Sequence, residues 1–124
     1  DLGQDIIDLP DDDFGVWYVD VMEHPERYEG KAMHAKTVVC HLPQYPGEVI
    51  LGRFAMTCCE ADITFLGLVA RGEGFDDYEN RSWVDVTGVI HLERHKAYQG
   101  EDGPVLHVTA LGPADKPEQE VLTF

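Results

Sequence analysis

The sequence has few basic residues and no long apolar run. Nine lysines and arginines stand against 24 aspartates and glutamates in its 124 residues, a net charge of −15 with the histidines neutral. A surface with this charge repels phosphate backbones, so we expect no nucleic-acid partner. No stretch approaches the roughly 20 apolar residues that cross a bilayer, and no signal-peptide pattern is present. The chain as given is therefore expected to be soluble.

The motifs of common enzymes are also missing. The sequence contains no glycine-rich phosphate loop, no nucleophile elbow and no serine–histidine–aspartate order. Because nothing in it points to catalysis, we expect a domain that is not an enzyme.

The length and the distribution of charge predict one domain with an acidic lead-in. A chain of 124 residues is long enough for one hydrophobic core and too short for two ordinary domains. Residues 1–29 hold ten carboxylates and a single basic residue, Arg27. Such a run favours a solvated, flexible segment, which we place at residues 1–13. Residues 14–124 then form the folded domain.

Short apolar runs separated by polar turns predict a mainly β structure. The expected strands are residues 32–39, 49–57, 63–70, 84–93 and 105–111. Alternation places His34 on the outer face of the first strand, and Phe54 and Met56 in the core of the second. The best helix candidate lies within Val16 to Glu29, as a short, broken helix with Val16, Val19 and Met22 on one face.

Five short strands with one longer connection fit a small closed barrel, because closure removes exposed sheet edges. We therefore predict an all-β fold with minor α content, a five-stranded barrel of OB-fold type with one short helix. The stretches YEGK and SWVDVTGVI are similar to the strand starts of OB-folds. A β-sandwich is the alternative architecture.

The most distinctive stretch of the chain is GRFAMTCCEAD, which runs from Gly52 to Asp62. Together with PERYEGK upstream and SWVDVTGVI downstream, it resembles the extracytoplasmic C-terminal domain of the YcgQ-type family of bacterial membrane proteins, over residues 14–124. The resemblance implies transmembrane helices before Asp1, a location on the extracytoplasmic face of the cell membrane, and a partner permease related to arsenical-efflux permeases. No established enzymatic activity comes with it.

Two adjacent thiols and a carboxylate are suitable ligands for zinc, another thiophilic metal or a metalloid. The candidate ligands are Cys58, Cys59 and Asp62. Successive side chains of a strand point to opposite faces, so the strand has to end or bulge before both thiols reach one ion. This set still leaves a coordination position open. The candidates to fill it are Cys40, His34, His41, His91 and His107.

Oxidation is the competing chemistry for these thiols. Cys40 can form a disulfide with Cys58 or Cys59 if the strands bring them together, and the odd number of cysteines leaves one thiol free. The domain is then a protein-interaction or structural barrel rather than a metal-binding accessory domain of a membrane protein. Arg53 has two possible roles, a salt bridge to Asp62 across a turn or recognition of an anionic ligand.

Overall fold

The computed structural model describes residues 6–45, 47–56 and 63–123. Its helix and strands, in chain order, are β1 (Ile6–Leu9), α1 (Asp11–Glu23), β2 (Ala32–His41), β3 (Glu48–Met56), β4 (Ile63–Arg71), β5 (Trp83–His95), β6 (Glu101–Pro113) and β7 (Val121–Thr123). The described residues also include the 3₁₀ turns η1 (Pro25–Tyr28), η3 (Phe75–Asp77) and η4 (Lys96–Tyr98).

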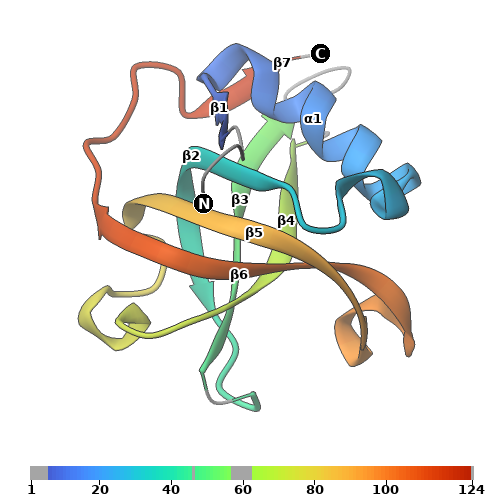
Figure 1. Cartoon of the computed structure of the whole chain (residues 1–124). Helices are drawn as coiled ribbons and strands as arrows, with labels where there is room; N and C mark the ends of the chain where they lie inside the picture. Colours follow the sequence, from blue (N-terminus) through green and yellow to red (C-terminus); the bar gives the residue numbers. More distant parts are fainter. Residues whose placement is uncertain (1–5, 46, 57–62, 124) are drawn as a thin grey trace.

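Five of the strands close into a barrel (Figure 1). The sheet order is β1-β2-β5-β6-β4-β3-β7, and an additional pairing of β2 with β3 completes the ring. Within the ring the β4–β6 pairing is parallel, whereas the four other pairings are antiparallel. This is the connectivity of an OB-fold. The predicted five-stranded barrel is confirmed, and the β-sandwich alternative is wrong.

The two additional strands cover the edges where the barrel splays open. β2 pairs with β3 only from Val38 to His41, and beyond this point the two strands separate. β1 then runs parallel to the free edge of β2, and β7 parallel to the free edge of β3. Unpaired strand edges attract other chains, so these short strands protect the opening.

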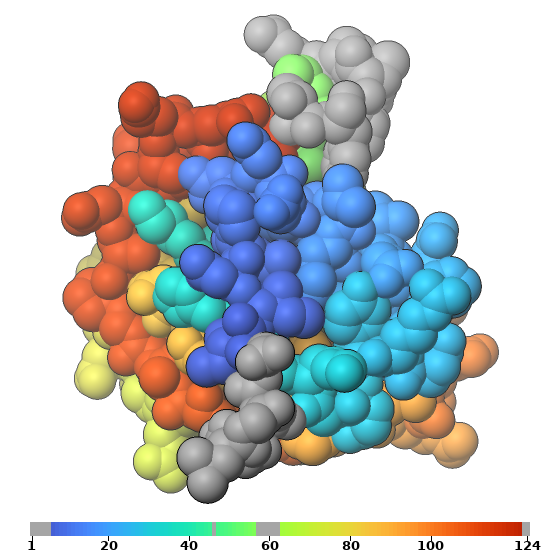
Figure 2. Space-filling model, turned by 45° about the horizontal axis from the view of Figure 1, so that its top comes forward, coloured from blue at the N-terminus to red at the C-terminus, as the bar shows by residue number. Residues whose placement is uncertain are grey.

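Part of the expected flexible lead-in belongs to the folded structure. Ile6–Leu9 form β1, and the acidic residues that follow begin α1. Three aspartates lie in the first turn of this helix, where carboxylates interact favourably with the helix dipole. Figure 2 shows β1 and α1 side by side across one face of the molecule. The acidic run therefore has a local structural role that composition alone does not reveal.

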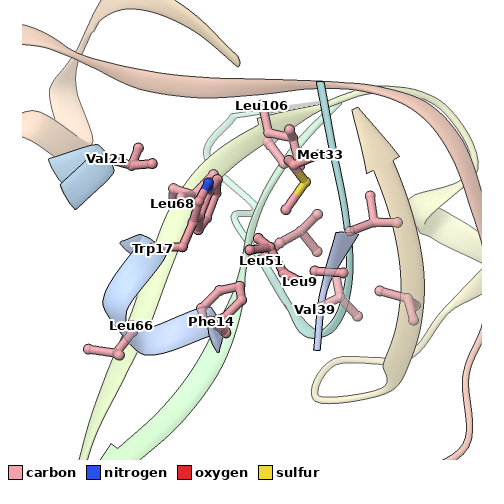
Figure 3. Close-up of a cluster of buried hydrophobic side chains, with 14 of the residues drawn as sticks. Leu9, Phe14, Trp17, Val21, Met33, Val39, Leu51, Leu66, Leu68 and Leu106 are labelled. Atoms are coloured by element: carbon pink, nitrogen blue, oxygen red, sulfur yellow. The ribbon is translucent and has the colours of Figure 1, made fainter. Parts of the chain in front are cut away.

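Helix α1 packs over one end of the barrel with a different face from the one we predicted. Phe14, Trp17 and Val21 are buried, whereas Val16 is 69% exposed and Val19 41% exposed. The buried side chains point toward the barrel interior in Figure 3. The helix starts five residues earlier than expected and ends before Pro25, so the inward-facing stripe begins at Phe14.

In β2 and β5 the buried face of the strand is the one predicted from alternation. In β3 the opposite face is buried. In β2, for example, Met33, Ala35, Thr37 and Val39 are all buried. In β3 the buried side chains are Val49, Leu51, Arg53 and Ala55. Phe54 and Met56 are only half-buried on the other face, where Phe54 packs against Phe65 with ring centroids 4.9 Å apart.

Candidate functional site

Arg53 is a charged side chain inside the barrel, with only 1% of its surface exposed. It projects from β3 just beyond Gly52, the last residue of that strand to pair with β2. Its Nη1 donates to Asp11 Oδ1 at 2.7 Å, and its Nη2 donates to the backbone oxygen of Gln119 at 2.9 Å. The guanidinium also lies 5.0 Å from the ring centre of Trp83.

These contacts make Arg53 a cross-link between three parts of the chain. Asp11 begins α1, and Gln119 precedes β7, so one guanidinium joins the helix and the last strand to the barrel. Asp11 is the carboxylate that pairs with Arg53 among the described residues, and the salt bridge predicted with Asp62 lies outside them. Both terminal nitrogens of Arg53 serve the fold, which favours a structural role over recognition of an anionic ligand.

Cys40 is a free thiol on β2. Burial raises the pKa of this thiol above its ordinary value, against the opposing effect of the Arg81 charge. Cys40 lies opposite Ile50, six residues before Met56 at the end of β3, which is about 20 Å along the strand. The structure therefore gives no disulfide at Cys40 and places it far from the end of β3.

Cys58, Cys59 and Asp62 lie outside the described residues. On either side of them, Met56 and Ile63 are paired as the last rung of the β3–β4 ladder. Within residues 6–45, 47–56 and 63–123, no group of three or more histidine, cysteine, aspartate or glutamate side chains is arranged to hold a metal ion.

A cleft of about 330 Å³ lies beside this end of the β3–β4 hairpin. Its lining comprises Val38, Phe54, Ile63, Arg81, Trp83, Glu120 and Val121. The Arg81 guanidinium lies 5.0 Å from the ring centre of Phe54, on the outer surface of the barrel. The cleft is thus mainly apolar and aromatic, with one cation and one carboxylate among its lining residues.

His34 lies on the outer face of β2, as its position in the strand predicted, and both of its ring nitrogens are occupied. Nδ1 lies 2.7 Å from Asp8 Oδ1, and Nε2 lies 2.7 Å from Asp85 Oδ1. The hydrogen bond to Asp8, followed by that to Asp85, raises the pKa of His34 above 6.5. With both ring nitrogens donating a proton to a carboxylate, His34 has no lone pair for a metal.

We predict that His34 titrates above pH 6.5 in the folded domain and that Asp8→Asn lowers its pKa. Because the folded-state pKa is raised, the stabilisation by these ion pairs is complete below pH 6.5 and disappears as the pH rises through the folded-state value. The measurement is an NMR titration of the histidine ring protons in both variants. A pKa of His34 at or below 6.5 in the unmodified domain contradicts the structure.

His91 and His107 lie together on the outer face of the β5–β6 hairpin, with ring centroids 4.5 Å apart. Each is bonded to a carboxylate, His91 to Glu29 and His107 to Glu93. His107 pairs with Arg71, eight residues after Ile63, which is about 26 Å along β4. The strand register therefore separates this pair from the end of the hairpin that leads to the two cysteines.

The carboxylates near these histidines extend into a longer polar network. Arg71 donates to Glu48 Oε2 at 2.7 Å and contacts Glu93 Oε1 at 2.9 Å. Glu48 also bonds His95 Nε2 at 2.8 Å. Burial acts to raise the pKa values of Glu48 and Glu93. Hydrogen bonds from Arg71 to both, from His95 to Glu48 and from His107 to Glu93 outweigh this effect and lower both pKa values. The residue-by-residue reading of the histidines missed this network, although strand alternation places all these side chains on outer faces.

Comparison with known proteins gives the family. No curated protein matches the chain. Residues 1–122 match the family described as DUF1980 C-terminal domain. No helix among the described residues has the length and apolar character to cross a membrane. Since the match spans nearly the whole chain, the protein belongs to the DUF1980 C-terminal domain family.

Proposed function

We propose that this chain is a non-enzymatic accessory domain of a membrane protein. In this proposal it lies on the extracytoplasmic face of the bacterial cell membrane, binds zinc or another thiophilic metal or metalloid, and serves a partner permease. The membrane context in this proposal comes from the resemblance of the PERYEGK, GRFAMTCCEAD and SWVDVTGVI stretches to YcgQ-type proteins. The metal ligands in the proposal are Cys58, Cys59 and Asp62.

The observation that carries the metal-binding proposal is the pairing of Met56 with Ile63. Met56 and Ile63 are antiparallel partners, and six residues separate them in the sequence. In a continuing strand, adjacent thiols would point to opposite faces, and one ion would not reach both. The proposal therefore requires the strand alternation to end before the two cysteines, so that neighbouring thiolates can reach one ion.

The position of Cys40 supports metal binding over the disulfide alternative. A disulfide needs Cα atoms within about 7 Å of each other. Cys40 is free and lies about 20 Å along the strand ladder from Met56, the last described residue before the two cysteines. A count of free thiols in the absence of reductant should therefore find Cys40 free. A Cys40 held in a disulfide would instead favour the alternative of a structural or protein-interaction barrel.

We predict that the reduced domain takes up zinc through Cys58 and Cys59. In native mass spectrometry, Cys58→Ser and Asp62→Asn should each weaken zinc uptake, by about tenfold or more for loss of a thiolate ligand. Cys40→Ser is the matched control, because it removes a thiol that is distant from the end of β3. Unchanged uptake in Cys58→Ser, or an equal loss in Cys40→Ser, contradicts the proposal.

A further inference from the structure

The pair formed by His91 and His107 differs from the other histidines near carboxylates. His91 lies on β5 opposite Val105, and His107 lies on β6 opposite Val89, so the two are diagonal neighbours across one hairpin. Their side chains are 41% and 37% exposed. Their rings are inclined at 69° with centroids 4.5 Å apart. Two imidazoles are thus held side by side at the surface.

Each ring is fixed by a carboxylate that leaves its second nitrogen available. Glu29 Oε2 lies 2.7 Å from His91 Nδ1, while its other oxygen accepts the Leu92 backbone N–H at 2.7 Å. Glu93 bonds His107 Nε2. Ionised carboxylates only accept hydrogen bonds, so the bonded nitrogens carry the protons in the neutral rings. The lone pairs then belong to His91 Nε2 and His107 Nδ1.

These two nitrogens have no hydrogen-bond partner in the described part of the chain, unlike those of the comparable histidines. His34 bonds a carboxylate with each of its nitrogens. His95 bonds Glu48 with Nε2 and accepts the Ala97 backbone N–H with Nδ1. A carboxylate on one nitrogen and a free lone pair on the other is the arrangement that metal-ligating histidines show, because the carboxylate sets the tautomer and increases the basicity of the ligand.

We propose that His91 Nε2 and His107 Nδ1 together bind one divalent transition-metal ion of the class that prefers imidazole, with water in its other coordination positions. With metal–nitrogen bonds of about 2.1 Å, two imidazoles at about 90° around one ion place their ring centroids roughly 4.5 Å apart. The observed centroid spacing of 4.5 Å equals this value, and the 69° between the planes is that of an edge-to-face ring pair. The nearby Glu29 and Glu93 and the acidic surface also favour the approach of a cation, while the Arg71 charge is balanced by Glu48 and Glu93.

This site is separate from the thiolate site proposed above and does not depend on it. His107 lies about 26 Å along β4 from Ile63, where the described chain resumes after the cysteines. The site holds two protein ligands rather than three, so it is consistent with the absence of larger ligand groups among the described residues.

Titration calorimetry with Ni²⁺ on the folded, reduced domain tests the proposal. We expect a Ni²⁺-binding step, distinct from any binding by the thiolates, whose affinity falls at least about tenfold in His91→Asn and in His107→Asn, because each removes one of two ligands. Glu29→Gln should weaken binding by about 10-fold through loss of the supporting carboxylate. His34→Asn is the matched control, since its exposure equals that of His107 and its nitrogens are both occupied.

Two further variants separate this site from the thiolates. The double variant Cys58→Ser, Cys59→Ser should keep the histidine-dependent Ni²⁺ binding, while the double variant His91→Asn, His107→Asn should keep zinc uptake by the cysteines. Zinc-induced shifts of the ring nitrogens in NMR should appear at His91 and His107 and be absent at His34. No Ni²⁺ binding, equal weakening in His34→Asn, or loss of Ni²⁺ binding with the cysteines overturns the proposal.

Discussion

Replacement of Asp11 by alanine should lower the free energy of unfolding by about 3 to 5 kcal/mol, the range for removal of one partner of a buried ion pair. Asp11 itself is 38% exposed, but its partner Arg53 is only 1% exposed. The variant leaves the guanidinium buried without its counter-ion. The more exposed residue of the pair is thus the more damaging one to remove.

Asp12→Ala is the matched control for this prediction. Asp12 lies in the same first turn of α1 and is exposed, so its removal reports the loss of the helix-dipole interaction alone. Urea unfolding monitored by tryptophan fluorescence measures both variants. Arg53→Met should cost less than Asp11→Ala, because Asp11 then returns to water and the interior gains an apolar side chain. Equal stabilities of Asp11→Ala and Asp12→Ala would show that the buried ion pair does not support the fold.

Gly52→Ala should destabilise the domain by about 3 kcal/mol or more, at or beyond the upper end of ordinary overpacking. A Cβ at this position would lie 2.1 Å from the backbone oxygen of Leu66 and 2.6 Å from the Cα of Gly67. Both atoms belong to the backbone of β4, which pairs with β3 along its whole length. The clash is relieved only if two strands of the barrel move apart.

Two other glycines give a graded comparison. A Cβ at Gly67 would meet side-chain atoms of Ile50 and Phe65, which adjust more easily than backbone, so Gly67→Ala should cost less. A Cβ at Gly112, in β6, would have no atom within 4 Å, and Gly112→Ala should be neutral or stabilising by up to about 1 kcal/mol. Thermal unfolding should rank the variants in this order. Equal stabilities of Gly52→Ala and Gly112→Ala would contradict the close approach of β4 to Gly52.

The barrel was predictable from the sequence because its signals are local. Strand alternation in β2 and in β5 has one apolar and one mostly polar face, so periodicity identifies the inward residues directly. The long β5–β6 hairpin and the short connections then favour closure. The N-terminal strand β1 was missed because four residues in an acidic stretch carry little local signal, and their pairing with β2 is a long-range contact.

The error in β3 has a definite physical cause. Both faces of this strand carry apolar side chains, so alternation alone does not show which face is buried. Burial of the Arg53 charge depends on Asp11 and Gln119, which are 42 and 66 positions away in the sequence. Phe54, which alternation had assigned to the core, instead contacts Phe65 and Arg81 on the outer side.

One of the two candidate metal sites could be predicted from the sequence, and the other could not. The residue types of the cysteine segment suggest thiophilic chemistry from the sequence alone. The pairing of His91 with His107 depends on the β5–β6 register, including the irregularity between Thr87 and Gly88. Alternation places both on outer faces, but only the register shows that they are neighbours. The separation of these histidines from the cysteines likewise depends on the parallel pairing of β4 with β6.

The most direct test of the proposed function is a Co²⁺ titration of the reduced domain followed by absorption spectroscopy. Cobalt replaces zinc in thiolate sites and gives sulfur-to-metal charge-transfer absorption only when a thiolate is bound. We predict this absorption in the unmodified domain and in Cys40→Ser, and a marked loss in Cys58→Ser and Cys59→Ser. An unmodified, fully reduced domain without the charge-transfer band, or a band that survives in both variants, would contradict the account.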